Sequence, residues 1–120
     1  MSLTMPWTLP EDLRMLAETG DFAVVREVIS IFQTDTRARI RKLQQALADG
    51  DAAKARGEAH AIKGSSAQVG ALELSELCRG VEFAAARQDV AAASSLFPEL
   101  ETAFAAVCSA MSELRGHERP

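Results

Sequence analysis

The sequence predicts an all-α protein, an antiparallel up-down four-helix bundle with a short additional N-terminal helix. Signals for β-strands are nearly absent, because the chain has no tyrosine and is rich in alanine and leucine. Apolar residues instead recur at steps of three and four residues over long segments, which is typical of amphipathic helices. Short connections between such helices favour packing as antiparallel neighbours. The connections are marked by Gly20-Asp21, Gly50-Asp51, Gly70-Ala71 and Gln88-Asp89.

The first part of the chain is expected to hold a short helix and a long one. The short helix covers residues 11–18, has Pro10 at its start, and would cover one end of the bundle. The long helix follows Asp21, where Gly20 can close the first helix and the aspartate can cap the second. Thr36 interrupts the apolar row of the long helix, which indicates a weak spot or a bend. That row consists of Phe22, Val25, Ile29, Phe32, Ile40, Leu43 and Leu47.

Three more helices are expected over residues 51–69, 71–87 and 90–114. Asp51 can cap the first of them. Pro98 lies early in the last, so it should either kink that helix or mark its true first turn. The inward rows of the last two helices are Leu74, Leu77, Cys78, Val81 and Ala85, then Phe97, Leu100, Phe104, Val107, Met111 and Leu114.

The bulk properties indicate a single domain over residues 1–120, with a core at about residues 11–115 and frayed tails. The net charge of −4 argues against a nucleic-acid binder and against a polybasic membrane anchor. No apolar run approaches the roughly 18 to 20 residues that span a bilayer, and no secretory signal opens the chain. Cys78 and Cys108 fall on apolar rows, which predicts two buried free thiols in a reducing cytoplasm. No metal site is expected, because the two histidines are far apart and no Cys-x-x-Cys pair exists.

His60 is expected to face solvent from the helix over residues 51–69. At 100° per residue it lies about 200° from Ile62, which belongs to the inward row of this helix. The whole inward row is Ala55, Ala59, Ile62, Ser66 and Val69.

The side of the helix that carries His60 is made of small residues and cations. Gly57 and Gly64 lie there, although a glycine inside a helix costs about 1 kcal/mol relative to alanine. Their missing side chains leave room for another surface to approach the imidazole, while Arg56 and Lys63 place positive charge beside it. Such a site suits a phosphoryl group. Two plainer interpretations stay open: an ordinary surface histidine, and glycines that serve close helix packing.

The stretch His-Ala-Ile-Lys-Gly-Ser-Ser-Ala that begins at His60, followed by Gly70, resembles the signature of histidine-containing phosphotransfer (HPt) domains. The similarity extends over about residues 22–114. It implies that His60 accepts a phosphoryl group from the aspartyl phosphate of a receiver domain and passes it to another receiver. It also implies that Lys63 neutralises phosphoryl charge and that Gly64 gives the docking receiver clearance.

The resemblance suggests roles for residues around this motif as well. Glu82 falls where some family members place a residue that orients the imidazole, although a solvent-facing glutamate is an equal alternative. Ser65 is expected to form a local hydrogen bond, and Ser66, on the inward row, to bond a backbone carbonyl. His117 in the tail is assigned no role. The residues expected to bind the partner are Arg56, Gly57, Ser65, Ala67, Gln68 and Glu82.

The expected chemistry is that of a carrier without autonomous kinase activity and without a cofactor of its own. No carboxylate cluster that could hold Mg²⁺ lies near His60 in the sequence, and no glycine-rich phosphate loop is present, so the receiver would supply the metal. The expected partners are response-regulator receiver domains and a sensor histidine kinase, hybrid or not, and the chain is expected to be a monomer. One alternative is a scaffold bundle that binds receivers without chemistry. The other is a helical phosphatase in which Gln68 positions water.

Overall fold

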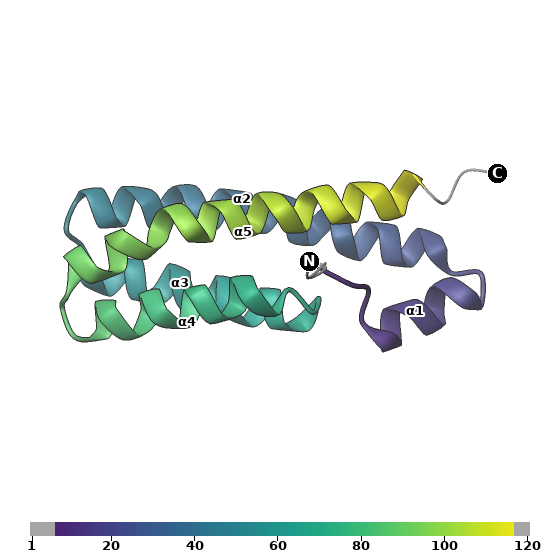
Figure 1. The fold of residues 1–120 in the computed structure, drawn as a ribbon, viewed down its shortest axis with the longest axis horizontal. Coiled ribbons are helices and arrows are strands. Elements are labelled where there is room, and N and C mark those ends of the chain that lie inside the picture. Colours follow the sequence, from purple (N-terminus) through teal and green to yellow (C-terminus); the bar gives the residue numbers. More distant parts are fainter. Residues whose placement is uncertain (1–6, 117–120) are drawn as a thin grey trace, which may run out of the picture.

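The computed structural model describes residues 7–116, which contain five helices and no strand. They are α1 (Glu11–Glu18), α2 (Phe22–Ala48), α3 (Ala52–Gln68), α4 (Leu72–Ala86) and α5 (Val90–Gly116). Contacts join α2 to α3, α3 to α4, α4 to α5 and α5 back to α2, which closes a four-helix bundle. The predicted fold class is therefore confirmed. In Figure 1 the long helices α2 and α5 lie along the whole molecule, and α1 occupies the length that the shorter α3 and α4 leave open.

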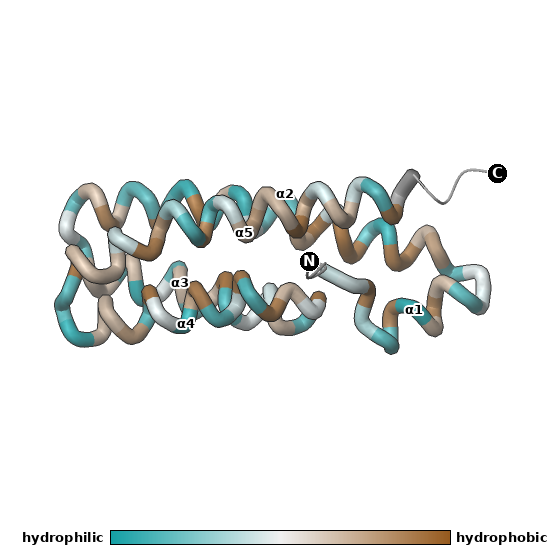
Figure 2. The backbone as a smooth tube through the Cα atoms, viewed as in Figure 1, coloured by the Kyte–Doolittle hydropathy of each residue, from teal (hydrophilic) through white to brown (hydrophobic). Residues whose placement is uncertain are grey.

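The core is built from the apolar rows that the periodicity predicts. Hydrophobic stretches recur along every helix in alternation with hydrophilic ones (Figure 2). Burying one such row per helix removes apolar surface from water, and this stabilises the bundle more than helix propensity does. The largest fully buried apolar side chains are Ile29, Leu43, Ile62, Leu74, Leu100 and Met111.

The helix ends follow the predicted turn residues with one exception. The Asp51 carboxylate accepts a hydrogen bond from the backbone N–H of Lys54 at 3.0 Å, as an N-cap should. Asp21 also occupies an N-cap position, but its side chain makes no capping bond, so this part of the prediction is wrong. The reason is its backbone, whose ψ of 40° departs from the extended conformation that aims an N-cap side chain at the first turn.

The N-terminal segment is fastened to the turn between α3 and α4. The indole N–H of the buried Trp7 donates to the carbonyl of Val69 at 2.6 Å. Gly70 in that turn has a φ of +77°, and a Cβ there would meet the Pro10 ring at 3.0 Å. The turn therefore requires glycine for its conformation and for the close approach of the segment. The segment and α1 cover this end of the bundle.

Thr36 does not break α2, which is one helix from Phe22 to Ala48. Its side chain is fully buried and occupies the gap in the apolar row between Phe32 and Ile40. The Thr36 hydroxyl has no hydrogen-bond partner among the described residues. A buried hydroxyl without a partner destabilises the fold, so the irregularity in the sequence marks an energetic cost and not a bend.

We expect Thr36→Val to raise the free energy of unfolding by about 1 kcal/mol or more, because valine keeps the shape and removes the unsatisfied hydroxyl. Denaturant unfolding monitored by circular dichroism measures the change. Thr36→Ser keeps the hydroxyl and loses a buried methyl group, so it should lower the free energy of unfolding by about 1 kcal/mol. A valine variant less stable than the wild type would contradict the assignment.

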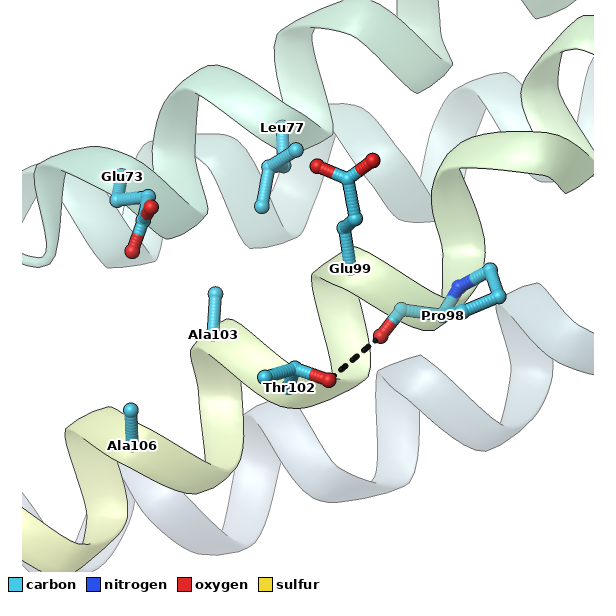
Figure 3. A pocket seen from close by; sticks show the side chains of 7 residues that line it. All are labelled: Glu73, Leu77, Pro98, Glu99, Thr102, Ala103 and Ala106. Atoms are coloured by element: carbon cyan, nitrogen blue, oxygen red, sulfur yellow. Dashed lines mark hydrogen bonds between the residues drawn. The ribbon is translucent and has the colours of Figure 1, made fainter.

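Pro98 lies inside α5, which begins at Val90, so it does not mark the first turn of that helix. It borders a groove of about 360 Å³ between α4 and α5, with Glu99 and Leu77 on the facing walls (Figure 3). The groove belongs to the α4–α5 side of the bundle and contains no residue of α3. It is therefore separate from the surface that carries His60.

Both cysteines are free, but only Cys78 is fully buried, while Cys108 is partly exposed. Burial raises the pKa of the Cys78 thiol to about 12, with a smaller contribution from the Glu82 charge, so this thiol is inert at neutral pH. Among residues 7–116, no helix is apolar over a stretch long enough to cross a bilayer.

Candidate functional site

His60 points into solvent from the outer side of α3, and its side chain is 67% exposed. The glycines on the same side are not explained by packing, because a Cβ built on Gly57 or Gly64 would meet nothing within 4 Å. The interpretation that they serve close helix packing is therefore wrong. By contrast, a Cβ on Gly80 of α4 would meet Leu96 of α5 at 3.0 Å, which is a true packing position. Gly57 and Gly64 therefore leave open space on the surface beside His60.

The imidazole of His60 is tied to α4 through Glu82. Its Nδ1 lies 2.8 Å from Oε2 of Glu82, while Nζ of Lys63 lies 2.7 Å from Oε1 of the same carboxylate. The Glu82 side chain is only 18% exposed. The alternative of a solvent-facing glutamate is thus excluded. One carboxylate from α4 holds both chemically important side chains of α3.

The charge state of this cluster follows from its contacts. Burial alone would raise the pKa of Glu82, but hydrogen bonds from Lys63 and His60 outweigh burial and lower that pKa below its ordinary value of 4.5. Glu82 is therefore ionised at neutral pH and accepts a hydrogen bond from Nδ1–H. That bond assigns the Nδ1–H tautomer to the neutral ring. Nε2 has no hydrogen-bond partner within residues 7–116, so its lone pair is available to an incoming group.

We expect the stability that Glu82 contributes to depend on pH. Because its pKa is lower in the folded chain, the contribution is complete above the ordinary value of 4.5 and is lost as the pH falls through the folded-state pKa. On acidification, the free energy of unfolding should therefore fall further in the wild type than in Glu82→Gln. The difference should be on the order of 1 kcal/mol, because partial exposure to solvent weakens the hydrogen bonds to Glu82. Urea unfolding of both proteins at several pH values measures the difference. Parallel curves for the two would contradict it.

The Lys63 side chain is held in an ion pair that the sequence did not predict. Its ammonium group is held by Glu82, and its side chain is 31% exposed. The hydroxyl of Ser75 on α4 donates to the carbonyl of Lys63 at 3.1 Å, which fixes α3 against α4 at this level. The cation expected to neutralise phosphoryl charge therefore lies beside His60 and is paired with Glu82 in this structure.

The remaining sequence-predicted residues divide into two groups. Arg56, Gly57, Ala67 and Gln68 are exposed on α3. The Ser65 hydroxyl donates to the carbonyl of Ala61 at 3.2 Å, which is the expected local hydrogen bond.

Ser66 does not form the predicted bond to a backbone carbonyl. It is fully buried, and its hydroxyl has no hydrogen-bond partner in the part of the chain that the structure describes. Its side chain takes a core position on the inward row of α3. His117 lies outside the described residues.

Sequence reasoning missed the groove that borders this surface on the α2 side. It encloses about 200 Å³ and runs beside Ser65 and Gln68 of α3, with Val28 and Ile31 of α2 opposite. Ile31 is 61% exposed. The signal was present in the sequence, because these apolar residues lie off the inward row of the long helix.

A second feature that the sequence did not reveal is an ion-pair bridge at the α2–α3 edge. Arg39 of α2 contacts Glu58 of α3 and Asp35 of its own helix, each at 3.2 Å. The guanidinium donates both hydrogen bonds, and both raise the pKa of Arg39, the bond to Asp35 more than the bond to Glu58. No group of three potential metal ligands is present within residues 7–116.

Comparison with known proteins identifies relatives of this architecture. The family model of the Hpt domain matches residues 27–110. Among solved structures, the chain is similar to histidine-containing phosphotransfer protein B (HptB) from Pseudomonas aeruginosa PAO1. The two share 31% sequence identity with a TM-score of 0.82, over 92% of this chain and 96% of the other. No curated protein matches the sequence.

Proposed function

Because the chain belongs to the Hpt domain family, it is a phosphotransfer carrier of a phosphorelay, and we propose that His60 is the residue that carries the phosphoryl group. The observation that supports this most is the state of the imidazole. The ring is exposed on the side of α3 that carries Gly57 and Gly64, its Nδ1 is hydrogen-bonded to the partly buried Glu82 carboxylate, and its Nε2 has no partner within residues 7–116. A nucleophilic histidine requires this arrangement of one oriented and one available nitrogen.

In the proposed reaction, Nε2 of His60 attacks the phosphorus of an aspartyl phosphate on a receiver domain. The aspartate carboxylate leaves in line with the attack, and negative charge accumulates on the three phosphoryl oxygens. Lys63 and Arg56 supply positive charge on the side where these oxygens lie. Glu82 fixes the ring orientation through Nδ1, which removes a rotational degree of freedom from the nucleophile.

Hpt domains work with receiver domains and histidine kinases, and we propose that a receiver docks over His60 and the groove between α2 and α3. Gly57 and Gly64 give its backbone room to approach the imidazole. The exposed Ile31, which lines this groove opposite Ser65 and Gln68, offers the receiver an apolar contact. In this proposal the chain acts as a monomer, because the receiver and not a second copy covers this surface.

The proposal assigns no kinase activity to the chain. The described residues offer no carboxylate cluster for Mg²⁺, so the acidic site of the receiver would hold the metal that phosphoryl transfer uses. A cytoplasmic location is part of the same proposal, since both thiols are free and receiver domains are the partners.

The direct test is to incubate the protein with a receiver domain that carries a radiolabelled aspartyl phosphate. We expect the label to appear on the protein in an acid-labile, base-stable form, as a phosphohistidine would be. A scaffold without chemistry would bind the receiver and remain unlabelled. A phosphatase would release inorganic phosphate without a labelled stage. Either result would overturn the proposal.

A further inference from the structure

We propose that Glu82 keeps the proton on Nδ1 of His60 after phosphorylation, and that this retained proton is what makes the phosphoryl group transferable to the next receiver. The inference rests on the proposed function, because it concerns the phosphorylated form of the same histidine. It makes Glu82 a positioning residue, whose carboxylate acts on the phosphoryl group only through the ring.

The first transfer leaves the ring of His60 with both nitrogens occupied. The neutral ring attacks through Nε2, the Nε2–P bond forms, and the O–P bond of the aspartyl phosphate breaks with its electron pair on the leaving carboxylate. The ring already carried a proton on Nδ1, so it is now a phosphorylated imidazolium. Nothing in the transfer itself removes that proton.

The onward transfer depends on whether the proton is still there. When the Nε2–P bond breaks, its electron pair returns to the ring. With Nδ1 protonated, the leaving group is neutral imidazole. Once Nδ1 has lost its proton, the leaving group is imidazolate, which is far more basic and leaves far more slowly. An unpaired imidazolium in water has a pKa of about 6.5, so a free phosphorylated ring would lose much of this advantage near neutral pH.

The position of Glu82 counters this loss. Its carboxylate lies 2.8 Å from Nδ1 and its side chain is 18% exposed, so the attraction between the anion and the cationic ring is screened less than at an open surface. An opposite charge at this distance favours the protonated ring. Lys63 opposes the effect, because its ammonium group shares the same carboxylate at 2.7 Å.

The other charged groups around the ring do not replace Glu82. On α4 the Cys78 thiol is uncharged at neutral pH, and Arg79 is a cation paired loosely with Glu76 at 3.9 Å. On α2, Arg39 reaches across to α3, where it is already paired with Glu58 as well as with Asp35 of its own helix. Among residues 7–116, Glu82 is the anion in hydrogen-bond contact with His60. The remaining cation on the His60 side of α3 is Arg56.

Two variants separate the charge of Glu82 from its position. Glu82→Gln keeps a side-chain oxygen that can accept from Nδ1–H but removes the negative charge. Lys63→Met removes the opposing cation and leaves the carboxylate to the ring alone. The inference predicts opposite effects: the protonated phosphorylated ring should be less favoured in Glu82→Gln and more favoured in Lys63→Met than in the wild type.

The experiment phosphorylates the wild type and both variants with phosphoramidate, which needs no docked receiver. The ³¹P resonance of each is then followed from about pH 5 to about pH 10, a range that brackets the ordinary imidazole pKa. The midpoint should move down in Glu82→Gln and up in Lys63→Met. In parallel, the rate of transfer to an unphosphorylated receiver should fall above the midpoint, by up to about tenfold per pH unit. Below the midpoint Glu82→Gln should approach the wild-type rate.

The outcomes distinguish the two proposals. If the wild type takes up no phosphoryl group from phosphoramidate or from a receiver, the proposed function fails. If the wild type is labelled but Glu82→Gln has the same ³¹P midpoint, Glu82 does not retain the proton and the inference is wrong. A uniform loss of transfer rate at every pH with an unchanged midpoint would likewise reduce Glu82 to a structural role.

Discussion

Replacing His60 by glutamine is expected to abolish phosphorylation of the protein by a labelled receiver while leaving its fold intact. Glutamine cannot form the phosphoramidate, so the label should fall to background. The His60 side chain is 67% exposed, and within residues 7–116 its hydrogen bond is to Glu82, so the free energy of unfolding should change by no more than about 0.5 kcal/mol. Autoradiography gives the label, and circular dichroism with urea unfolding gives the fold and the stability.

The chain provides a matched control in its other histidine. His117→Gln removes an imidazole of the same kind from the tail, and this variant should be labelled as strongly as the wild type. If His60→Gln is still labelled, or if His117→Gln is not, the phosphoryl acceptor is not His60 of α3. Loss of helical signal in His60→Gln would show that the side chain is needed for folding, contrary to its exposure.

The second large effect is expected at Gly64, where stability and transfer should change in opposite directions. A Cβ built there meets nothing within 4 Å among residues 7–116, so Gly64→Gln should raise the free energy of unfolding by about 0.5 kcal/mol through its better helix propensity. The same side chain would stand one turn from His60, where the receiver must approach. A displacement of about 1 Å between the reacting atoms can cost roughly 100-fold in rate, and we expect a loss of this order.

The comparison with Gly80 separates steric clearance from internal packing. A Cβ at Gly80 meets Leu96 at 3.0 Å on the side of α4 that faces α5, so Gly80→Ala should change stability and leave the transfer rate unchanged. Phosphoramidate is a small molecule that phosphorylates accessible histidines without a docked receiver. It should therefore still phosphorylate Gly64→Gln. Unimpaired transfer from a receiver to Gly64→Gln would show that the bare surface has no role in docking.

Features that depend on neighbours along the chain could be predicted from the sequence. The steps of three and four between apolar residues are a property of one helix, and so is the placement of His60 opposite Ile62. The spacing that carries the family resemblance, a histidine followed one turn later by a lysine and a glycine, is equally local. The exception at Asp21 is local too, because its backbone departs from the conformation that aims an N-cap side chain at the first turn.

What the sequence by itself determined is therefore the set of helices, their buried sides and the exposure of one imidazole on a surface of glycines. Only the tertiary structure decided which side chains contact that imidazole. Glu82 is 22 residues away and reaches both His60 and Lys63 because α3 and α4 pack antiparallel at a fixed rotation. The unpartnered hydroxyls of Thr36 and Ser66 and the groove beside Ile31 depend on the same packing. Helical periodicity fixes the direction of a side chain on its own helix, whereas contacts between helices depend on how neighbouring helices shift and rotate against one another.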